Sequence, residues 1–203
     1  MFQIPFLFCL VIFGAQLASS ERFQGCYLDD STSRDLPVAK AMGTSNSVQA
    51  CVDHCTSRAY KYAGLQGSTC YCGDSFGKYC KVDNAECDTS CAGRSQEKCG
   101  SSNKNSVYST NYLGCWSDSP IRDLENYTQI DSSEATIETC VALCQSRGYR
   151  YAGAQYYRQC FCSNSYGMYP EKERSSCSTP CHGNNQQKCG GSWANSVYDA
   201  LYY

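Results

Sequence analysis

The sequence predicts an α+β fold made of two small disulfide-rich domains, each with one helix packed on a small antiparallel sheet. Three observations carry this prediction. The chain of 203 residues contains 18 cysteines, their spacing repeats once along the chain, and each copy holds one helical and two strand-like patterns. A domain of this size buries only a modest apolar core. We therefore expect four disulfides per domain to supply much of its stability.

The repeat is an eight-cysteine unit that occurs twice. The stretch 51–72 returns as 140–162, and each copy reads Cys-x3-Cys, then Tyr-(Lys/Arg)-Tyr-Ala-Gly, then Cys-(Tyr/Phe)-Cys. The matched cysteines are Cys26, Cys51, Cys55, Cys70, Cys72, Cys87, Cys91 and Cys99 in the first unit, and Cys115, Cys140, Cys144, Cys160, Cys162, Cys177, Cys181 and Cys189 in the second. We expect the domains to span 21–110 and 111–203.

The first 20 residues have the character of a secretory signal peptide. Residues 2–18 are apolar and uncharged, and small residues precede Glu21, which predicts cleavage after Ser20. An uncleaved signal anchor is the alternative. Because no second long apolar run follows, we expect no membrane span and a secreted, extracellular protein.

Cysteine density and charge indicate the compartment of the protein and the ligands that it does not bind. Without Cys9, which falls in the predicted signal peptide, 17 of the 18 cysteines remain, a density typical of oxidising compartments. Disulfides are therefore expected in place of a metal site, and no cofactor is expected. The 17 Lys and Arg against 19 Asp and Glu leave no basic stripe, so nucleic acid is not an expected partner.

The spacing of apolar residues predicts one helix in each unit. Apolar residues at i, i+3, i+4 and i+7 predict helices that start at Val48 and Ile137. Ser47 and Thr136 are suitable N-caps. Gly148 can end the second helix in the left-handed conformation, whereas Ala59, at the matching position, is a poorer stop.

Two short strands follow each helix. In the first unit they are Tyr60-x-Tyr62 and Cys70-x-Cys72, with turn residues between them. Cysteines four apart on a helix and two apart on a strand share one face at a similar spacing. We therefore expect the helix pair to bridge to the strand pair, and the other four cysteines to pair among themselves. Eight cysteines allow 105 connectivities, so the order within each set stays open.

Cys80 is the odd cysteine, because Pro170 stands at the matching position. Its thiol is expected to be free, joined to glutathione or engaged in a covalent dimer.

The interleaved motifs resemble a known family. Gly25-Cys26-Tyr27-x-Asp29, Arg34-Asp35-Leu36-Pro37 and Tyr62-Ala63-Gly64-Leu65-Gln66 recur with small changes in the second unit, which reads Gly-Cys-Trp-x-Asp, Arg-Asp-Leu and Tyr-Ala-Gly-Ala-Gln-Tyr. These motifs resemble the WSC domain of fungal cell-wall stress sensors and of other secreted and membrane proteins. The resemblance covers nearly all of the mature chain. It implies a compact PAN/apple-like fold, four disulfides per unit and non-catalytic binding of polysaccharide.

The chain departs from the family pattern at two points. The family's Tyr after the Gln is present as Tyr156, whereas the first unit has the shorter Gly67-Ser68-Thr69 there. The family's sensors also carry a Ser/Thr-rich stalk and a membrane span, neither of which is seen here. A sensor role is therefore not expected.

Catalytic motifs are lacking. His54 and His182 match Leu143 and Ala92, so neither belongs to the repeated design, and no nucleophile elbow or zinc-hydrolase motif occurs. We therefore expect that the protein is not an enzyme. Asn126-Tyr127-Thr128 is a sequon that makes Asn126 a candidate N-glycosylation site.

Aromatic and short polar side chains are the expected sugar contacts, since sugars present apolar CH faces and directional hydroxyls. The candidate carbohydrate-binding residues are Tyr156, Tyr157, Arg158, Asn164, Tyr166 and Tyr169, with Asp74, Phe76 and Tyr79 in the first unit. Six other aromatic residues are expected to pack inward under the disulfides: Tyr62, Tyr71, Tyr108, Tyr151, Phe161 and Tyr198. The expected partner is a polysaccharide or a glycoprotein glycan, and an extracellular protein is the alternative.

Overall fold

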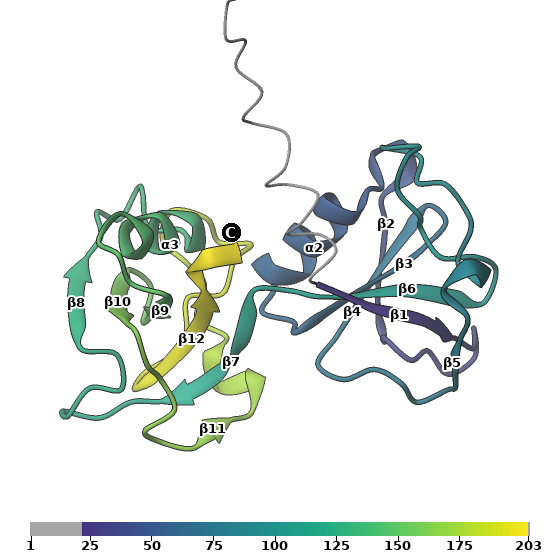
Figure 1. Ribbon diagram of the computed structural model, residues 1–203. Coiled ribbons are helices and arrows are strands. Elements are labelled where there is room, and N and C mark those ends of the chain that lie inside the picture. The colour runs from purple at the N-terminus through teal and green to yellow at the C-terminus, as the bar shows by residue number, and fades with distance from the viewer. Residues whose placement is uncertain (1–21, 203) are drawn as a thin grey trace, which may run out of the picture.

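The structure is a computed structural model that describes residues 22–202, so the predicted signal peptide lies outside the described residues. Each half of the chain forms its own antiparallel six-stranded sheet with one α-helix beside it (Figure 1). The predicted α+β class, with two disulfide-rich units of four bridges each, is confirmed. The sheets are larger than the sequence indicated, because four further strands join the two predicted strands in each sheet, and two of these four lie in its interior.

The first sheet has the order β2-β4-β3-β6-β1-β5. Its strands are β1 (Phe23–Leu28), β2 (Val38–Ala41), β3 (Tyr62–Gln66), β4 (Thr69–Gly73), β5 (Lys81–Val82) and β6 (Lys104–Ser109). The strand expected at residues 60–62 begins only at Tyr62, because Tyr60 still belongs to the turn after the helix.

The second sheet repeats this topology in the order β11-β7-β12-β9-β10-β8. Its strands are β7 (Tyr112–Ser117), β8 (Asn126–Gln129), β9 (Tyr151–Gln155), β10 (Gln159–Ser163), β11 (Glu171–Lys172) and β12 (Ala194–Asp199). Short 3-10 helices η1 (Gly43–Ser45), η2 (Asn84–Glu86), η3 (Arg174–Cys177) and η4 (Ala200–Tyr202) lie in the connections.

The helices α2 (Val48–Ser57) and α3 (Ile137–Ser146) begin at the predicted caps. The Ser47 side chain accepts a hydrogen bond from the Ala50 N–H, and the Thr136 side chain accepts one from the Thr139 N–H. Both helices end in the same way, since Ala59 has a φ of 56° and Gly148 a φ of 78°. Ala59 adopts the left-handed turn although its Cβ disfavours it, because its side chain is fully buried among residues of the second unit.

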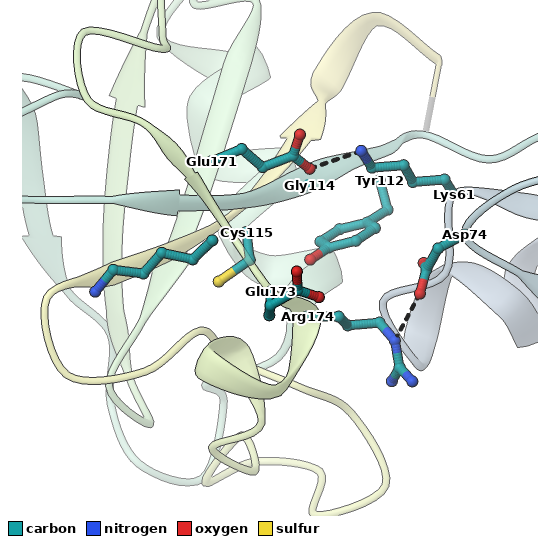
Figure 2. A pocket seen from close by; sticks show the side chains of 9 residues that line it. Lys61, Asp74, Tyr112, Gly114, Cys115, Glu171, Glu173 and Arg174 are labelled. Carbon is teal, nitrogen blue, oxygen red and sulfur yellow. Dashed lines mark hydrogen bonds and ion pairs between the residues drawn. The ribbon is translucent and has the colours of Figure 1, made fainter.

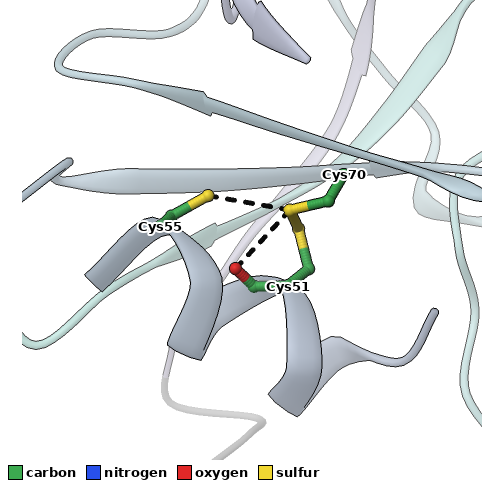
Figure 3. A group of neighbouring side chains, drawn as sticks. All are labelled: Cys51, Cys55 and Cys70. Carbon is green, nitrogen blue, oxygen red and sulfur yellow. Dashed lines mark hydrogen bonds between the residues drawn. A yellow bond between two sulfur atoms is a disulfide. The ribbon is translucent and has the colours of Figure 1, made fainter. Parts of the chain in front are cut away.

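The disulfides follow the helix-to-strand rule. Cys51 and Cys55 of α2 bridge to Cys70 and Cys72 of β4, in that order, and α3 and β10 repeat the pattern. The remaining pairs are Cys26–Cys87, Cys91–Cys99, Cys115–Cys177 and Cys181–Cys189. The sulfurs of Cys51, Cys55 and Cys70, shown in Figure 3, lie within 4.8 Å of one another, as metal ligands do. Each belongs to a disulfide, so none is a thiolate able to bind a metal ion.

Each sheet buries side chains on both faces. One face carries the helix and the disulfides, and the opposite face carries a second cluster around Leu36 or Leu124. The expectation for the six inward aromatic residues is correct for Tyr108 and Tyr198, which pack on the helix face. Tyr71 and Phe161 are buried as expected, but they and the partly buried Tyr62 and Tyr151 pack on the opposite face and not under the disulfides. Adjacent residues of a strand alternate between faces, so a ring next to a bridged cysteine points away from the bridge.

The two units are joined by Thr110 and Asn111, which lie between β6 and β7 and are bonded to both units. The Thr110 N–H donates to the Lys61 carbonyl at 2.9 Å, and the Asp199 N–H donates to the Asn111 carbonyl at 2.8 Å. Both linker residues are buried.

Each helix among the described residues is too short or too polar to cross a membrane.

Candidate functional site

The hairpin between β9 and β10 carries the most exposed of the candidate tyrosines. Tyr156 and Tyr157 occupy consecutive left-handed positions, with φ of 41° and 73°. Bulky residues rarely adopt this conformation, and such strain is concentrated at functional positions. Tyr156 is 50% exposed, and its ring meets that of Tyr157 edge-on at 4.9 Å. The hairpin therefore places two adjacent rings at one end of the second sheet.

Tyr157 is supported from the loop that carries the Cys181–Cys189 bridge. Its ring centroid lies 4.8 Å from that of His182 at a tilt of 31°, and the His182 N–H donates to the Tyr157 carbonyl. Beside it the Arg158 guanidinium donates to the Ser132 hydroxyl at 3.3 Å. This combination of rings, a cation and hydroxyls can contact a polyhydroxylated ligand.

The first unit lacks these rings. Its hairpin turns through Gly67, with a φ of 57°, and Ser68. Glycine adopts that conformation without strain, so the turn itself does not require tyrosine. The turn of this hairpin, Gly67 and Ser68, offers a ligand no aromatic side chain.

Other candidates hold loops in place. Tyr166 meets Trp116 at 5.2 Å and Tyr151 at 4.7 Å, both edge-on, and Phe76 contacts Tyr27 and Tyr62 in the same way. These rings pack in the cluster around Leu36 or Leu124, on the sheet face opposite the helix.

The hydroxyls of Tyr169 and Tyr79 close loops of the second and first unit. The Tyr169 hydroxyl donates to the Ile121 carbonyl at 2.8 Å, and the Tyr79 hydroxyl donates to the Ser33 carbonyl at 2.8 Å. The Asn164 side chain accepts a hydrogen bond from the Arg150 N–H at 3.0 Å. These three side chains are committed to internal contacts and lie apart from the β9–β10 hairpin.

Asp74 lines a cleft between the two units (Figure 2). The cleft has a volume of about 310 Å³. Two ion pairs cross it, between Lys61 and Glu171 at 2.6 Å and between Asp74 and Arg174 at 2.9 Å. The Arg174 guanidinium also lies 4.1 Å from the centre of the Tyr60 ring. The charges of this cleft are largely paired across the two units, which makes it a contact between them.

The floor of this cleft is the nearly buried ring of Tyr112 (Figure 2). Burial raises the pKa of its hydroxyl, and the nearby Asp74 carboxylate raises it further. The hydroxyl therefore stays protonated at physiological pH. The ring packs on Tyr198 at 5.4 Å and so continues the core of the second unit.

A second exposed aromatic group, which no sequence motif indicates, lies on the sheet face of the second unit that is opposite the helix, here called the outer face. Trp193 and Tyr127 are 45% and 49% exposed. Trp193 lies against Arg122, Tyr127 lies against the buried ring of Phe161, and Arg122 also lies over Phe161. A comparison of the two units could have found them, because the matching residues of the first unit are Asn103 and Ala39.

Cys80 and Asn126 are candidate modification sites that lie outside both aromatic groups. Cys80 is the free cysteine of the described residues, and it is exposed. Asn126 lies half-buried on the edge strand β8, where its side-chain amide donates to the Cys162 carbonyl at 3.3 Å.

Comparison with known proteins matches the WSC domain model to residues 23–101 and 112–191. A WSC domain-containing protein of Arthroderma benhamiae is 30% identical over 196 residues, which cover 88% of this chain and 27% of the relative. The xylosyltransferase oxt of Drosophila melanogaster is 40% identical over 91 residues, or 43% of this chain and 10% of that enzyme. A protein of Chaetomium globosum named putative fungistatic metabolite is 26% identical over 89% of this chain and 93% of its own length. The chain thus spans about a quarter of the length of the Arthroderma relative.

Proposed function

Because this chain belongs to the WSC domain family and carries the domain twice, we propose that it is a secreted, non-catalytic protein that binds polysaccharide. The glycan is one of a cell wall or an extracellular matrix. Disulfides join all of the described cysteines except Cys80, as suits an oxidising compartment. The match to the xylosyltransferase covers 10% of that enzyme, so its transferase activity is not carried over.

The observation that carries the proposal is the pair of left-handed tyrosines at the β9–β10 hairpin. Tyr156 and Tyr157 keep a strained backbone and an exposed aromatic surface where the first unit turns through Gly67 and Ser68. Sugar rings stack their CH faces on such side chains. The second unit is therefore the main binding unit, and the first supplies a smaller share of the affinity.

An extracellular protein partner is the second candidate. Exposed tyrosines are also common at protein interfaces, so the same hairpin suits either ligand. Exposed Cys80 adds a route to a covalent dimer, which a non-reducing gel would reveal.

Pull-down of the secreted chain on insoluble glucan, chitin, cellulose and xylan tests the proposal. We expect binding to at least one polymer, and we expect Tyr156→Ala or Tyr157→Ala to weaken it by roughly 1 to 3 kcal/mol. Tyr166→Ala serves as a contrast, since that ring packs between Trp116 and Tyr151 and its loss should lower stability. A folded chain that binds none of the four polymers but captures a secreted protein would favour the second candidate.

A further inference from the structure

A row of stacked groups lies on the outer face of the second unit. The Arg122 guanidinium carbon lies 4.8 Å from the centre of the Trp193 ring and 4.9 Å from that of Phe161. The Tyr127 ring lies 5.1 Å from Phe161 on β10. We call these four residues the Trp193 ladder. Trp193 and Tyr127 are exposed, whereas Phe161 is fully buried beneath Arg122 and Tyr127.

Half of the ladder also occurs in the first unit and belongs to the fold. There Arg34 lies 4.9 Å from the centre of the Tyr71 ring and pairs with Asp29. Asn103 and Ala39 stand where the second unit has Trp193 and Tyr127. An arginine over a buried ring is thus common to both units, whereas the two exposed rings are additions that the fold does not need.

Trp193 is held in a conformation that disfavours a large side chain. Its φ is 52°, and that of Asn103 is 55°. Asparagine tolerates this region and tryptophan does not. The backbone is fixed in the same way in both units, because the Trp193 carbonyl accepts from the Asp118 N–H at 3.0 Å and the Asn103 carbonyl from the Asp29 N–H at 2.9 Å. A strained and exposed tryptophan adds little to the core, so it is best explained as a contact residue.

The charge of the ladder is compensated. Arg122 pairs with the buried Asp118 carboxylate at 2.6 Å, and the Gln155 amide donates to the same carboxylate at 2.8 Å. The ladder therefore carries no free positive charge that would select an acidic ligand. It offers aromatic faces for apolar surfaces and, around them, polar groups for hydrogen bonds.

The ladder lies at the same end of the sheet as the tyrosine hairpin. Trp193 directly precedes β12, and Ser196 of that strand pairs with Ala154 of antiparallel β9. The start of β12 is therefore beside the end of β9, where Tyr156 begins the turn. A long ligand can extend from one aromatic group toward the other.

We propose that the Trp193 ladder is a second contact site, beside the tyrosine hairpin, at which the second unit binds an extended, neutral polysaccharide, with one sugar on Trp193 and another on Tyr127. This inference rests on the proposed polysaccharide-binding function. Trp193 and Tyr127 are connected through Arg122 and Phe161, with about 5 Å between neighbouring groups, so the two exposed rings belong to one continuous surface. Compensated charge favours neutral polymers over acidic ones.

The test uses the full secreted chain and soluble oligosaccharides of glucan, chitin, cellulose and xylan. Trp193→Asn installs the residue of the first unit, which suits the left-handed backbone, so the melting temperature should not fall. We expect it to lower affinity roughly ten- to a hundredfold and to remove the ligand-induced change in tryptophan fluorescence. Tyr127→Ala should act in the same direction with a smaller effect. Met168→Ala is the control, because Met168 is 62% exposed and lies off the ladder.

Three outcomes separate the two proposals. If Trp193→Asn binds oligosaccharide as the unaltered chain does, the ladder is not the site, although the proposed function stands. If the unaltered chain binds none of the oligosaccharides or polymers, the function and the ladder both fall. If Trp193→Asn loses only a secreted protein partner, the ladder is a protein contact. Adding Asn103→Trp and Ala39→Tyr to the first unit of the Trp193→Asn variant should restore part of the lost affinity.

Discussion

The cost of removing a disulfide from the second unit should follow the length of the loop that it closes. The Cys115–Cys177 bridge spans 62 residues and the Cys181–Cys189 bridge spans 8. Replacing both cysteines of one bridge by serine opens the loop without leaving a lone thiol. The four cysteines are 1 to 3% exposed, so the two double variants lose similar buried surface and differ mainly in loop entropy.

The expected magnitudes follow from chain entropy. Freeing a loop of 62 residues should lower the free energy of unfolding by about 4.3 kcal/mol, and freeing one of 8 residues by about 2.5 kcal/mol. The Cys140–Cys160 bridge, which spans 20 residues, should fall between them at about 3 kcal/mol. The predicted gap between the extremes is therefore about 2 kcal/mol.

Urea unfolding of the full chain measures these costs, and the first unit, left intact, serves as an internal reference. The matching bridges Cys26–Cys87 and Cys91–Cys99 span 61 and 8 residues and provide an independent repeat of the comparison. Equal costs for the long and short loops, or a reversed order in both units, would refute the entropic reasoning. The stabilisation would then come from contacts of the bridges within the native state.

Three further predictions concern single residues. Cys80→Ser should leave the melting temperature within about 1 °C of the unaltered value, because the thiol is exposed and unpaired; a large loss would show that Cys80 has a structural partner. Burial, followed by the charges of Arg58 and Lys40, lowers the pKa of His54 to about 4, so the unfolded chain binds its proton first as the pH falls. Stability should therefore be constant above pH 6.5 and decline from there toward pH 4, and His54→Leu, which copies Leu143, should reduce the decline in melts across that range. Asn126→Gln should remove an N-glycan detectable by mass spectrometry and leave polysaccharide binding unchanged, since Asn126 and Tyr127 point to opposite faces of β8; a loss of binding would contradict that placement.

Local sequence patterns determined a large part of this fold. The apolar spacing that starts at Val48 and Ile137 gives both helices, and Ser47 and Thr136 cap them as expected. Spacings of four on a helix and two on a strand decide which cysteines can face one another. Helix starts and bridging sets could be predicted because both depend on residues within a few positions of each other.

Only the tertiary structure decided which partner each group meets. The order Cys51–Cys70 and Cys55–Cys72 depends on how α2 lies across β4, and the left-handed turn at Ala59 depends on packing against the second unit. The Trp193 ladder joins residues from a loop, two strands and a turn that are far apart in the chain. No local pattern records such a contact, because it exists only once the strands are ordered in the sheet and the loop that carries Arg122 lies across its outer face.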